Sequence, residues 1–119
     1  WPISSDGPHG LDIDPVGGKA FVGCDGGQVV ALDLTAGTEV VRGPIAGEPD
    51  VVWCNSRRNR LYVAIGKPGL IEVIDARFLT PIEKVVTEDG AHTTAFDRTR
   101  QRLYVFLPRT CRAAVYEEA

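Results

Sequence analysis

Three residues whose side chains could together bind a metal ion are separated by almost equal intervals. Asp50 follows His9 by 41 positions, and His92 follows Asp50 by 42. Two imidazoles and a carboxylate are a plausible ligand set for a divalent metal. The alternative is that all three are solvated residues of loops that precede strands, since a motif alone is only a hypothesis.

Arginines in two corresponding turns form a second candidate site. The six residues are Arg57, Arg58, Arg60, Arg98, Arg100 and Arg102. Most acidic residues of the connections fall at the opposite ends of the expected strands, so one end of the molecule is predicted to be basic. A basic face of this kind could dock an anionic partner. The alternative is a set of solvated charged turns that keep the strand ends soluble.

Two further segments only superficially suggest chemistry. Ser4, Ser5, Asp6 and His9 offer a nucleophile, a base and an orienting carboxylate, but they lie in one short segment. A catalytic triad normally gathers its members from separate parts of a fold, so we predict no triad here. The glycine-rich stretch 23–27 lacks the Lys-Ser/Thr of a phosphate loop and a following helix, which predicts a turn between strands.

Composition narrows the range of partners and compartments. The three cysteines, Cys24, Cys54 and Cys111, form no CxxC motif and are predicted to be packing or surface residues. The net charge of −3 argues against nucleic acid as a partner, and the absence of a long apolar run predicts no membrane span. The chain contains no Met, so we expect it to be processed or cut from a longer protein, whose compartment stays open.

An internal repeat predicts the elements that position these residues. Ala20-Phe21-Val22, Leu61-Tyr62-Val63 and Leu103-Tyr104-Val105 recur at spacings of 41 and 42 positions, while 13 Gly and 8 Pro are spread along the chain. Short apolar segments between turns, with no helical periodicity, predict an all-β domain spanning residues 1–119. The predicted units cover residues 7–48, 49–90 and 91–119, with residues 1–5 as an outer strand.

Each unit is predicted to hold up to four strands. The first strands are 11–13, 51–54 and 93–96; the second contain the AFVG, RLYVA and RLYVF segments; the third are 29–32, 71–74 and 113–116; the fourth are 39–42 and 83–86. Asp14, Asn55 and Asp97 open the first turn of each unit, where an Asx side chain can accept a hydrogen bond from the backbone two positions on.

These units resemble the YVTN family of β-propeller repeats. The resemblance is carried by Gly7-Pro8-His9-Gly10, Thr35-Ala36-Gly37, Tyr62-Val63 and Val73-Ile74-Asp75, whereas Ala64-Ile65 departs from the family pattern, as does Phe106-Leu107 in the third unit. It implies blades of four antiparallel strands around a central channel, with His9, Asp50 and His92 at one channel mouth. Relatives of this kind are often exported, which makes an exported or periplasmic parent protein one expectation.

Three blades are fewer than a closed propeller contains, because propellers have about 4 to 8 blades. We therefore expect the chain to complete a ring by self-association, most simply as a homodimer with six blades. In that arrangement Trp1 to Ser4 would pair as an outer strand beside Ala113 to Tyr116, within one chain or across a chain junction. The alternative origin is the C-terminal part of a full propeller, which is compatible with self-assembly.

The predicted function is a non-enzymatic binding or interaction scaffold, with a second copy of the chain and a protein as partners and with no cofactor. An alternative from a different class is a metal-dependent lyase or hydrolase. Its site would lie at the channel mouth, with His9, Asp50 and His92 as metal ligands, because some propeller lyases of similar repeat type use channel histidines and a metal.

Overall fold

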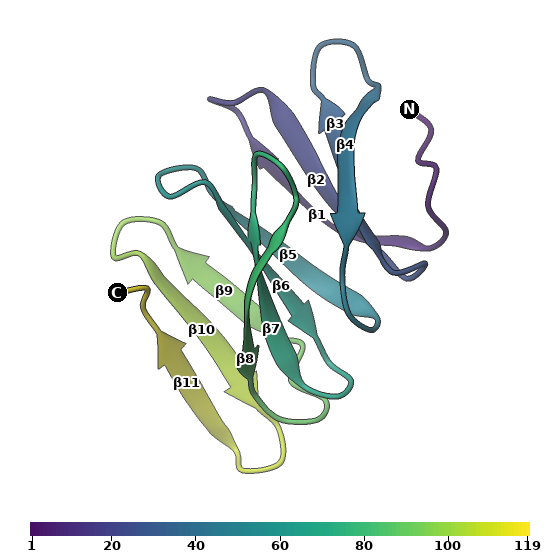
Figure 1. The fold of residues 1–119 in the computed structure, drawn as a ribbon. Helices are drawn as coiled ribbons and strands as arrows, with labels where there is room; N and C mark the ends of the chain where they lie inside the picture. The colour runs from purple at the N-terminus through teal and green to yellow at the C-terminus, as the bar shows by residue number, and fades with distance from the viewer.

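The computed structural model describes residues 1–119 and contains eleven β-strands and no helix. The strands form three antiparallel sheets, here called blades 1, 2 and 3 (Figure 1). Blade 1 holds β1 (Pro8–Asp14), β2 (Lys19–Cys24), β3 (Gln28–Asp33) and β4 (Glu39–Pro44); blade 2 holds β5 (Pro49–Asn55), β6 (Arg60–Ile65), β7 (Leu70–Asp75) and β8 (Pro81–Val86); blade 3 holds β9 (Thr94–Asp97), β10 (Arg102–Leu107) and β11 (Arg112–Tyr116). The predicted all-β class is confirmed, and each blade falls within one predicted unit.

Local turn chemistry explains the strand reversals that follow β1 and β9. The carboxylate of Asp14 accepts a hydrogen bond from the backbone of Val16 (3.1 Å), and that of Asp97 accepts one from Thr99 (2.9 Å), as predicted for Asx turns. Asn55 differs from this prediction, because its side chain is buried and contacts other side chains instead of its own turn. The side chain of Asp14 also accepts a hydrogen bond from the hydroxyl of Ser56 (2.9 Å), so the polar residue at this position links neighbouring blades from both blade 1 and blade 2.

The blades stack face to face over two apolar layers. Residues of blades 1 and 2 form a cluster of 13 buried side chains that includes Phe21, Val52 and Leu61. A second cluster of eight, including Tyr62 and Phe96, lies between blades 2 and 3. Every residue of β7 is buried, because both faces of blade 2 are covered. Four of its six residues are apolar, and burial on both faces is typical of strands in sheets that are covered on both sides.

A close contact between turn and strand joins the outer parts of blades 1 and 2. Leu79, in the turn between β7 and β8, is fully buried and lies against β4. A Cβ atom added to Gly43 would lie 1.9 Å from the carbonyl oxygen of Leu79, so only glycine permits this approach. We call residues one repeat apart counterparts. Trp1 is the counterpart of Gly43, and Gly37 is the counterpart of Leu79. Trp1 and Gly37 also lie in contact.

The N-terminal segment differs from the predicted outer strand. Residues 1–5 form no strand, and they lie on blade 1 instead of beside Ala113–Tyr116. The backbone N–H and hydroxyl of Ser4 both donate to the carboxylate of Glu39, at 2.5 and 2.8 Å. Ile3 packs on the cluster that forms the outward face of blade 1. Within one chain, these side-chain contacts take the place of strand pairing.

Blade 3 ends at its third strand, and this leaves β11 as an edge. The order of its sheet is β11-β10-β9, whereas β3 and β7 each have a fourth strand on their outer side. Figure 1 shows β11 at the rim of the stack, with the two ends of the chain on opposite sides. No helix of the protein is long and apolar enough to cross a membrane.

Candidate functional site

The residues predicted at the channel mouth do lie together. His9 is in β1, Asp50 is in β5 and His92 precedes β9, so the three blades bring them to one end of the inner strands. The Nε2 atom of His9 lies 3.4 Å from Oδ1 of Asp50, and Nδ1 of His92 lies 3.9 Å from Oδ2 of the same carboxylate. Asp50 therefore stands between the two imidazoles.

A fourth side chain, Asp25, extends this cluster at the mouth. Its carboxylate lies 3.5 Å from Nδ1 of His9, so that imidazole stands between two carboxylates. The cluster borders a hollow of about 330 Å³ whose ten lining residues include Lys67 and Glu48 and no hydrophobic residue. No group of three or more His, Cys, Asp or Glu side chains is arranged to hold a metal ion. The mouth is thus a hollow without an apolar wall, and its metal binding stays a prediction.

The basic turns are largely neutralised within the chain. Arg58 and Arg60 lie 3.7 and 3.5 Å from the carboxylate of Glu118. The remaining pairs are Arg98 with Asp12 (2.7 Å), Arg100 with Asp97 (3.0 Å) and Arg102 with Glu117. Of the six predicted arginines only Arg57 has no ion pair. These partners weaken the case for an anionic docking face, because most of the positive charge is already compensated.

The segments dismissed from the sequence have structural roles. The hydroxyl of Ser4 accepts a hydrogen bond from Arg42 (3.2 Å), whereas the imidazole of His9 lies beside the carboxylates of Asp25 and Asp50. In the glycine-rich stretch 23–27, Gly23 and Cys24 end β2, and residues 25–27 form the turn to β3. Cys24 and Cys54 are buried free thiols and Cys111 is exposed. Burial raises the pKa of the Cys54 thiol to about 11, which makes it unreactive at neutral pH.

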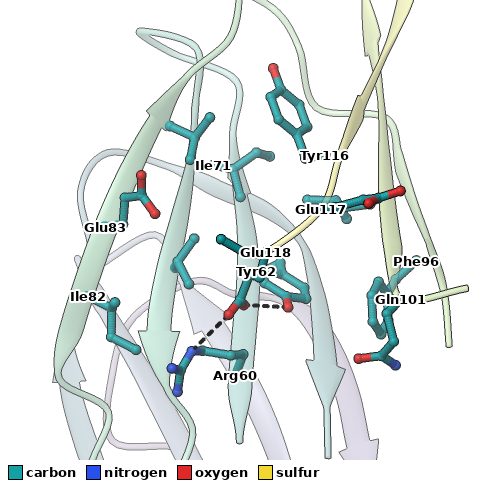
Figure 2. A pocket seen from close by; sticks show the side chains of 14 residues that line it. Arg60, Tyr62, Ile71, Ile82, Glu83, Phe96, Gln101, Tyr116, Glu117 and Glu118 are labelled. Carbon is teal, nitrogen blue, oxygen red and sulfur yellow. Dashed lines mark hydrogen bonds and ion pairs between the residues drawn. The ribbon is translucent and has the colours of Figure 1, made fainter. Parts of the chain in front are cut away.

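A groove between blades 2 and 3 was not predicted from the sequence. It measures about 430 Å³ and opens between β8 and β11 (Figure 2). Fourteen residues line it, and nine of them are apolar: Tyr62, Ile71, Val73, Ile82, Val85, Phe96, Leu103, Tyr116 and Ala119. The rings of Tyr62 and Phe96 pack at a centroid distance of 5.3 Å. Arg60, Glu83, Gln101 and Glu118 add polar groups to it.

A hydrogen-bond network closes one end of this groove, as Figure 2 shows in part. The hydroxyl of Tyr62 donates to Glu118 (2.7 Å) and accepts from the amide of Asn55 (3.1 Å), whose nitrogen also donates to Gln101 (2.8 Å). Burial, followed by the hydrogen bond with Glu118, raises the pKa of Tyr62 to about 12. The network fixes the last residues of the chain to blade 2.

The outward faces of the terminal blades expose apolar side chains. On blade 3, Phe106 and Val115 are 62% and 51% exposed, although their counterparts Ala64 and Val73 are buried under blade 3. A hollow of about 300 Å³ lies on this face and is lined in part by Tyr104 and Phe106. On blade 1, Leu11 and Ile13 are exposed, whereas their counterparts in β5, Val52 and Cys54, are buried.

Comparisons with known proteins identify the fold and no more. No protein-family model matches the sequence, and no curated protein matches it either. Among solved structures, dihydro-heme d1 dehydrogenase NirN in complex with DHE matches with a TM-score of 0.82 and 16% identity over 100% of this chain and 27% of that one. Hydrazine synthase of Kuenenia stuttgartiensis matches with a TM-score of 0.77 and 17% identity, covering 88% of this chain and 30% of that one.

A third match, U3-55K, has a TM-score of 0.75 and 12% identity, covering 99% of this chain and 41% of that one. The chain thus spans less than half the length of each of these structures. Because the three are propeller folds with different names and very low identity, the likeness confirms β-propeller blades and leaves the function to be argued from the site.

Proposed function

We propose that this protein is a non-enzymatic β-propeller interaction scaffold that completes its ring by binding a second copy of itself. The observation that carries the proposal is the difference in exposure between counterparts. Val115 of blade 3 is 51% exposed, whereas its counterpart Val73 is 7% exposed because blade 3 covers it. An outward face with the apolar pattern of a covered face is suited to receive another blade.

The opposite end of the stack supplies a complementary surface. Leu11 and Ile13, in β1, are 63% and 47% exposed, while their counterparts Val52 and Cys54 are almost fully buried against blade 1. Blade 1 of one copy would therefore cover blade 3 of the next, in a head-to-tail contact. Two copies joined in this way close on themselves with six blades, which is within the usual range for propellers.

Light scattering coupled to size exclusion tests this proposal. We expect the wild-type chain to elute with twice the monomer mass of 12.9 kDa. Phe106→Asp on blade 3 and Leu11→Asp on blade 1 should each give monomers, because either change places a carboxylate in the junction. Val16→Asp is the matched control, since Val16 is 91% exposed in the turn between β1 and β2 and belongs to no strand. A monomeric wild-type chain at all concentrations would refute self-association.

Mixing the two monomeric variants tests the head-to-tail geometry itself. The Phe106→Asp chain keeps an intact blade 1, and the Leu11→Asp chain keeps an intact blade 3. One undamaged junction can therefore form between them, and a mixed dimer is expected. If the contact instead joined identical surfaces, one of the two variants would still dimerise alone, and no mixed dimer would form, because every mixed pairing would place a carboxylate in the shared surface.

The second candidate function is a metal-dependent lyase or hydrolase at the channel mouth. The approach of His9 and His92 to opposite oxygens of Asp50 favours it. Isothermal titration with Zn²⁺ tests the site: one ion per chain, lost in His9→Ala, would support it. If His9→Ala binds Zn²⁺ with the same heat as the wild-type chain, His9 is not a metal ligand and this site is refuted.

A further inference from the structure

Asp-Gly pairs occur three times in the chain, at positions 6–7, 25–26 and 89–90. An aspartate that precedes glycine can isomerise without an enzyme, because glycine has no side chain to shield its backbone nitrogen from the neighbouring carboxyl group. All three pairs lie in exposed loops outside the strands. Sequence and exposure therefore do not distinguish them, and the contacts of the reacting groups decide which pair reacts.

The isomerisation requires a free backbone nitrogen and a free carboxyl group. The glycine nitrogen loses its proton and bonds to the carboxyl carbon of the aspartate, and a carboxyl oxygen leaves as water. Water then opens the resulting five-membered succinimide. Opening at the side-chain carbonyl restores aspartate, whereas opening at the main-chain carbonyl gives isoaspartate, so water is the only co-reactant. A hydrogen bond from the glycine N–H, or a cationic partner of the carboxylate, opposes ring closure.

The pair at 25–26 is held at both reacting groups. The N–H of Gly26 donates to the carbonyl oxygen of Asp6 (2.9 Å), and the carboxylate of Asp25 lies 3.5 Å from the imidazole of His9. The N–H of Asp25 also donates to the carbonyl oxygen of Gly7 (2.9 Å). Two backbone hydrogen bonds thus fasten this turn to the loop that enters blade 1.

The pair at 89–90 is held in the same two ways. The N–H of Gly90 donates to the carbonyl oxygen of Gly66 (2.6 Å). The carboxylate of Asp89 lies 3.7 Å from the guanidinium of Arg109. Ring closure here would have to break the backbone bond and separate the ion pair.

The pair at 6–7 has neither restraint. The N–H of Gly7 donates no hydrogen bond within the chain, and the carboxylate of Asp6 has no hydrogen-bond or ion-pair partner there. We propose that Asp6 is a site of spontaneous isomerisation, at which isoaspartate accumulates in the folded protein in preference to Asp25 and Asp89. The modification loosens the loop that enters blade 1.

Isoaspartate would alter contacts beside the channel mouth. The main chain then runs through the side-chain carbons of residue 6 and is one atom longer, and the carbonyl group that accepted from Gly26 becomes a branching carboxylate. The bonds from Gly26 to Asp6 and from Asp25 to Gly7 cannot both keep their present register. Because the carboxylate of Asp25 contacts His9, the change reaches the cluster at the mouth.

Peptide mapping of the aged full chain tests the preference for Asp6. Trypsin places the three pairs on separate peptides, 1–19, 20–42 and 85–98. The chain is incubated at neutral pH either folded or in urea, and isoaspartate is located by electron-transfer fragmentation. For each pair, the rate in the folded chain is divided by the rate in urea. We expect this ratio to be about fivefold or more higher for Asp6, because one backbone hydrogen bond suppresses a free amide by about that factor.

Asp6→Glu is the matched variant, since it keeps the carboxylate but would need a six-membered ring, which closes far more slowly. Gly7→Ala is unsuitable, because Gly7 has φ +63° and an added Cβ would lie 2.7 Å from the Cβ of Asp25. Aged wild-type chain should show faster amide exchange at residues 25 and 26, and aged Asp6→Glu should not. Equal ratios for the three pairs, or isoaspartate at residue 6 that leaves this exchange unchanged, would overturn the proposal.

Discussion

The carboxylate of Asp12 lies 2.7 Å from the guanidinium of Arg98, although the two residues are 86 positions apart. Asp12 belongs to blade 1 and Arg98 to the first turn of blade 3, so the ion pair passes across the inner edge of blade 2. The same Asp12 oxygen also accepts a hydrogen bond from the backbone N–H of Cys54 in blade 2 (2.8 Å). One side chain thus contacts all three blades.

Replacing Asp12 should therefore destabilise the whole stack. Asp12→Ala leaves the buried N–H of Cys54 without an acceptor, and we expect a loss of about 1–3 kcal/mol in the free energy of unfolding. Arg98→Ala should cost less, about 1 kcal/mol, because Arg98 is half exposed. Urea denaturation measures both, with Arg57→Ala as a control that removes no ion pair. A value for Asp12→Ala equal to that control would contradict the role given to Asp12.

Leu79 should be the most sensitive residue of the turns. Leu79→Ala empties the space between blades 1 and 2, and substitutions of this kind in a core cost about 2–5 kcal/mol. Phe78→Ala, one position earlier, is the matched control because its ring is 65% exposed, and it should cost less than about 1 kcal/mol. Thermal unfolding followed by circular dichroism compares the two. Similar melting temperatures would mean that Leu79 does not anchor the blades.

The Tyr62 hydroxyl should stabilise the protein in a pH-dependent way. Tyr62→Phe removes its bonds to Asn55 and Glu118, at a cost of about 1 kcal/mol near neutral pH. The folded state raises the pKa of Tyr62 from 10.0 to about 12, so its contribution is fully present below pH 10 and is lost as pH rises from 10 through 12. Urea midpoints across this range should fall more steeply for the wild type than for Tyr62→Phe; parallel curves would contradict this.

Asp75 should stabilise the protein in a way that is lost at low pH, whereas the contribution of Tyr62 is lost at high pH. The hydrogen bond from Arg77 and the backbone bonds of its turn lower its pKa from 3.8 to about 2. A lowered pKa stabilises the fold at every pH above the unfolded value, and this contribution is lost as pH falls from about 4 through 2. Asp75→Asn has no carboxylate to protonate here, so its free energy of unfolding should fall less between about pH 4 and 2 than that of the wild type. Stability of the two proteins measured at several pH values below 5 checks it, and unchanged acid sensitivity would show that other carboxylates govern the loss.

Much of the fold follows from the sequence because each blade repeats one local pattern. The recurrence of Leu61-Tyr62-Val63 and its counterparts fixes the spacing of the inner strands, and Asp14 and Asp97 stabilise their turns with contacts two positions away. Interactions within a repeat can be predicted in this way, since they depend on near neighbours. The convergence of His9, Asp50 and His92 follows from the same periodicity.

Contacts that break the periodicity could not be predicted in this way. Asn55 turns inward because Tyr62 and Gln101 offer it partners, and no counterpart in blade 1 does the same. The pairing of Arg98 with Asp12 skips a whole blade, so the basic turns looked more highly charged than they are. The groove is lined by residues of two blades, so it shows only when the blades are stacked.

The complete burial of β7 has a consequence for how the molecule opens. Strands β6 and β7 lie in the middle of blade 2. Their amide hydrogens can exchange with solvent only when blade 2 loses both neighbouring blades, which requires nearly global unfolding. The amides of β11 need only the separation of one strand from β10. Exchange measured by mass spectrometry should therefore be slowest in β6 and β7 and fastest at β11, with a gradient of local stability that falls toward the C-terminal end of the stack.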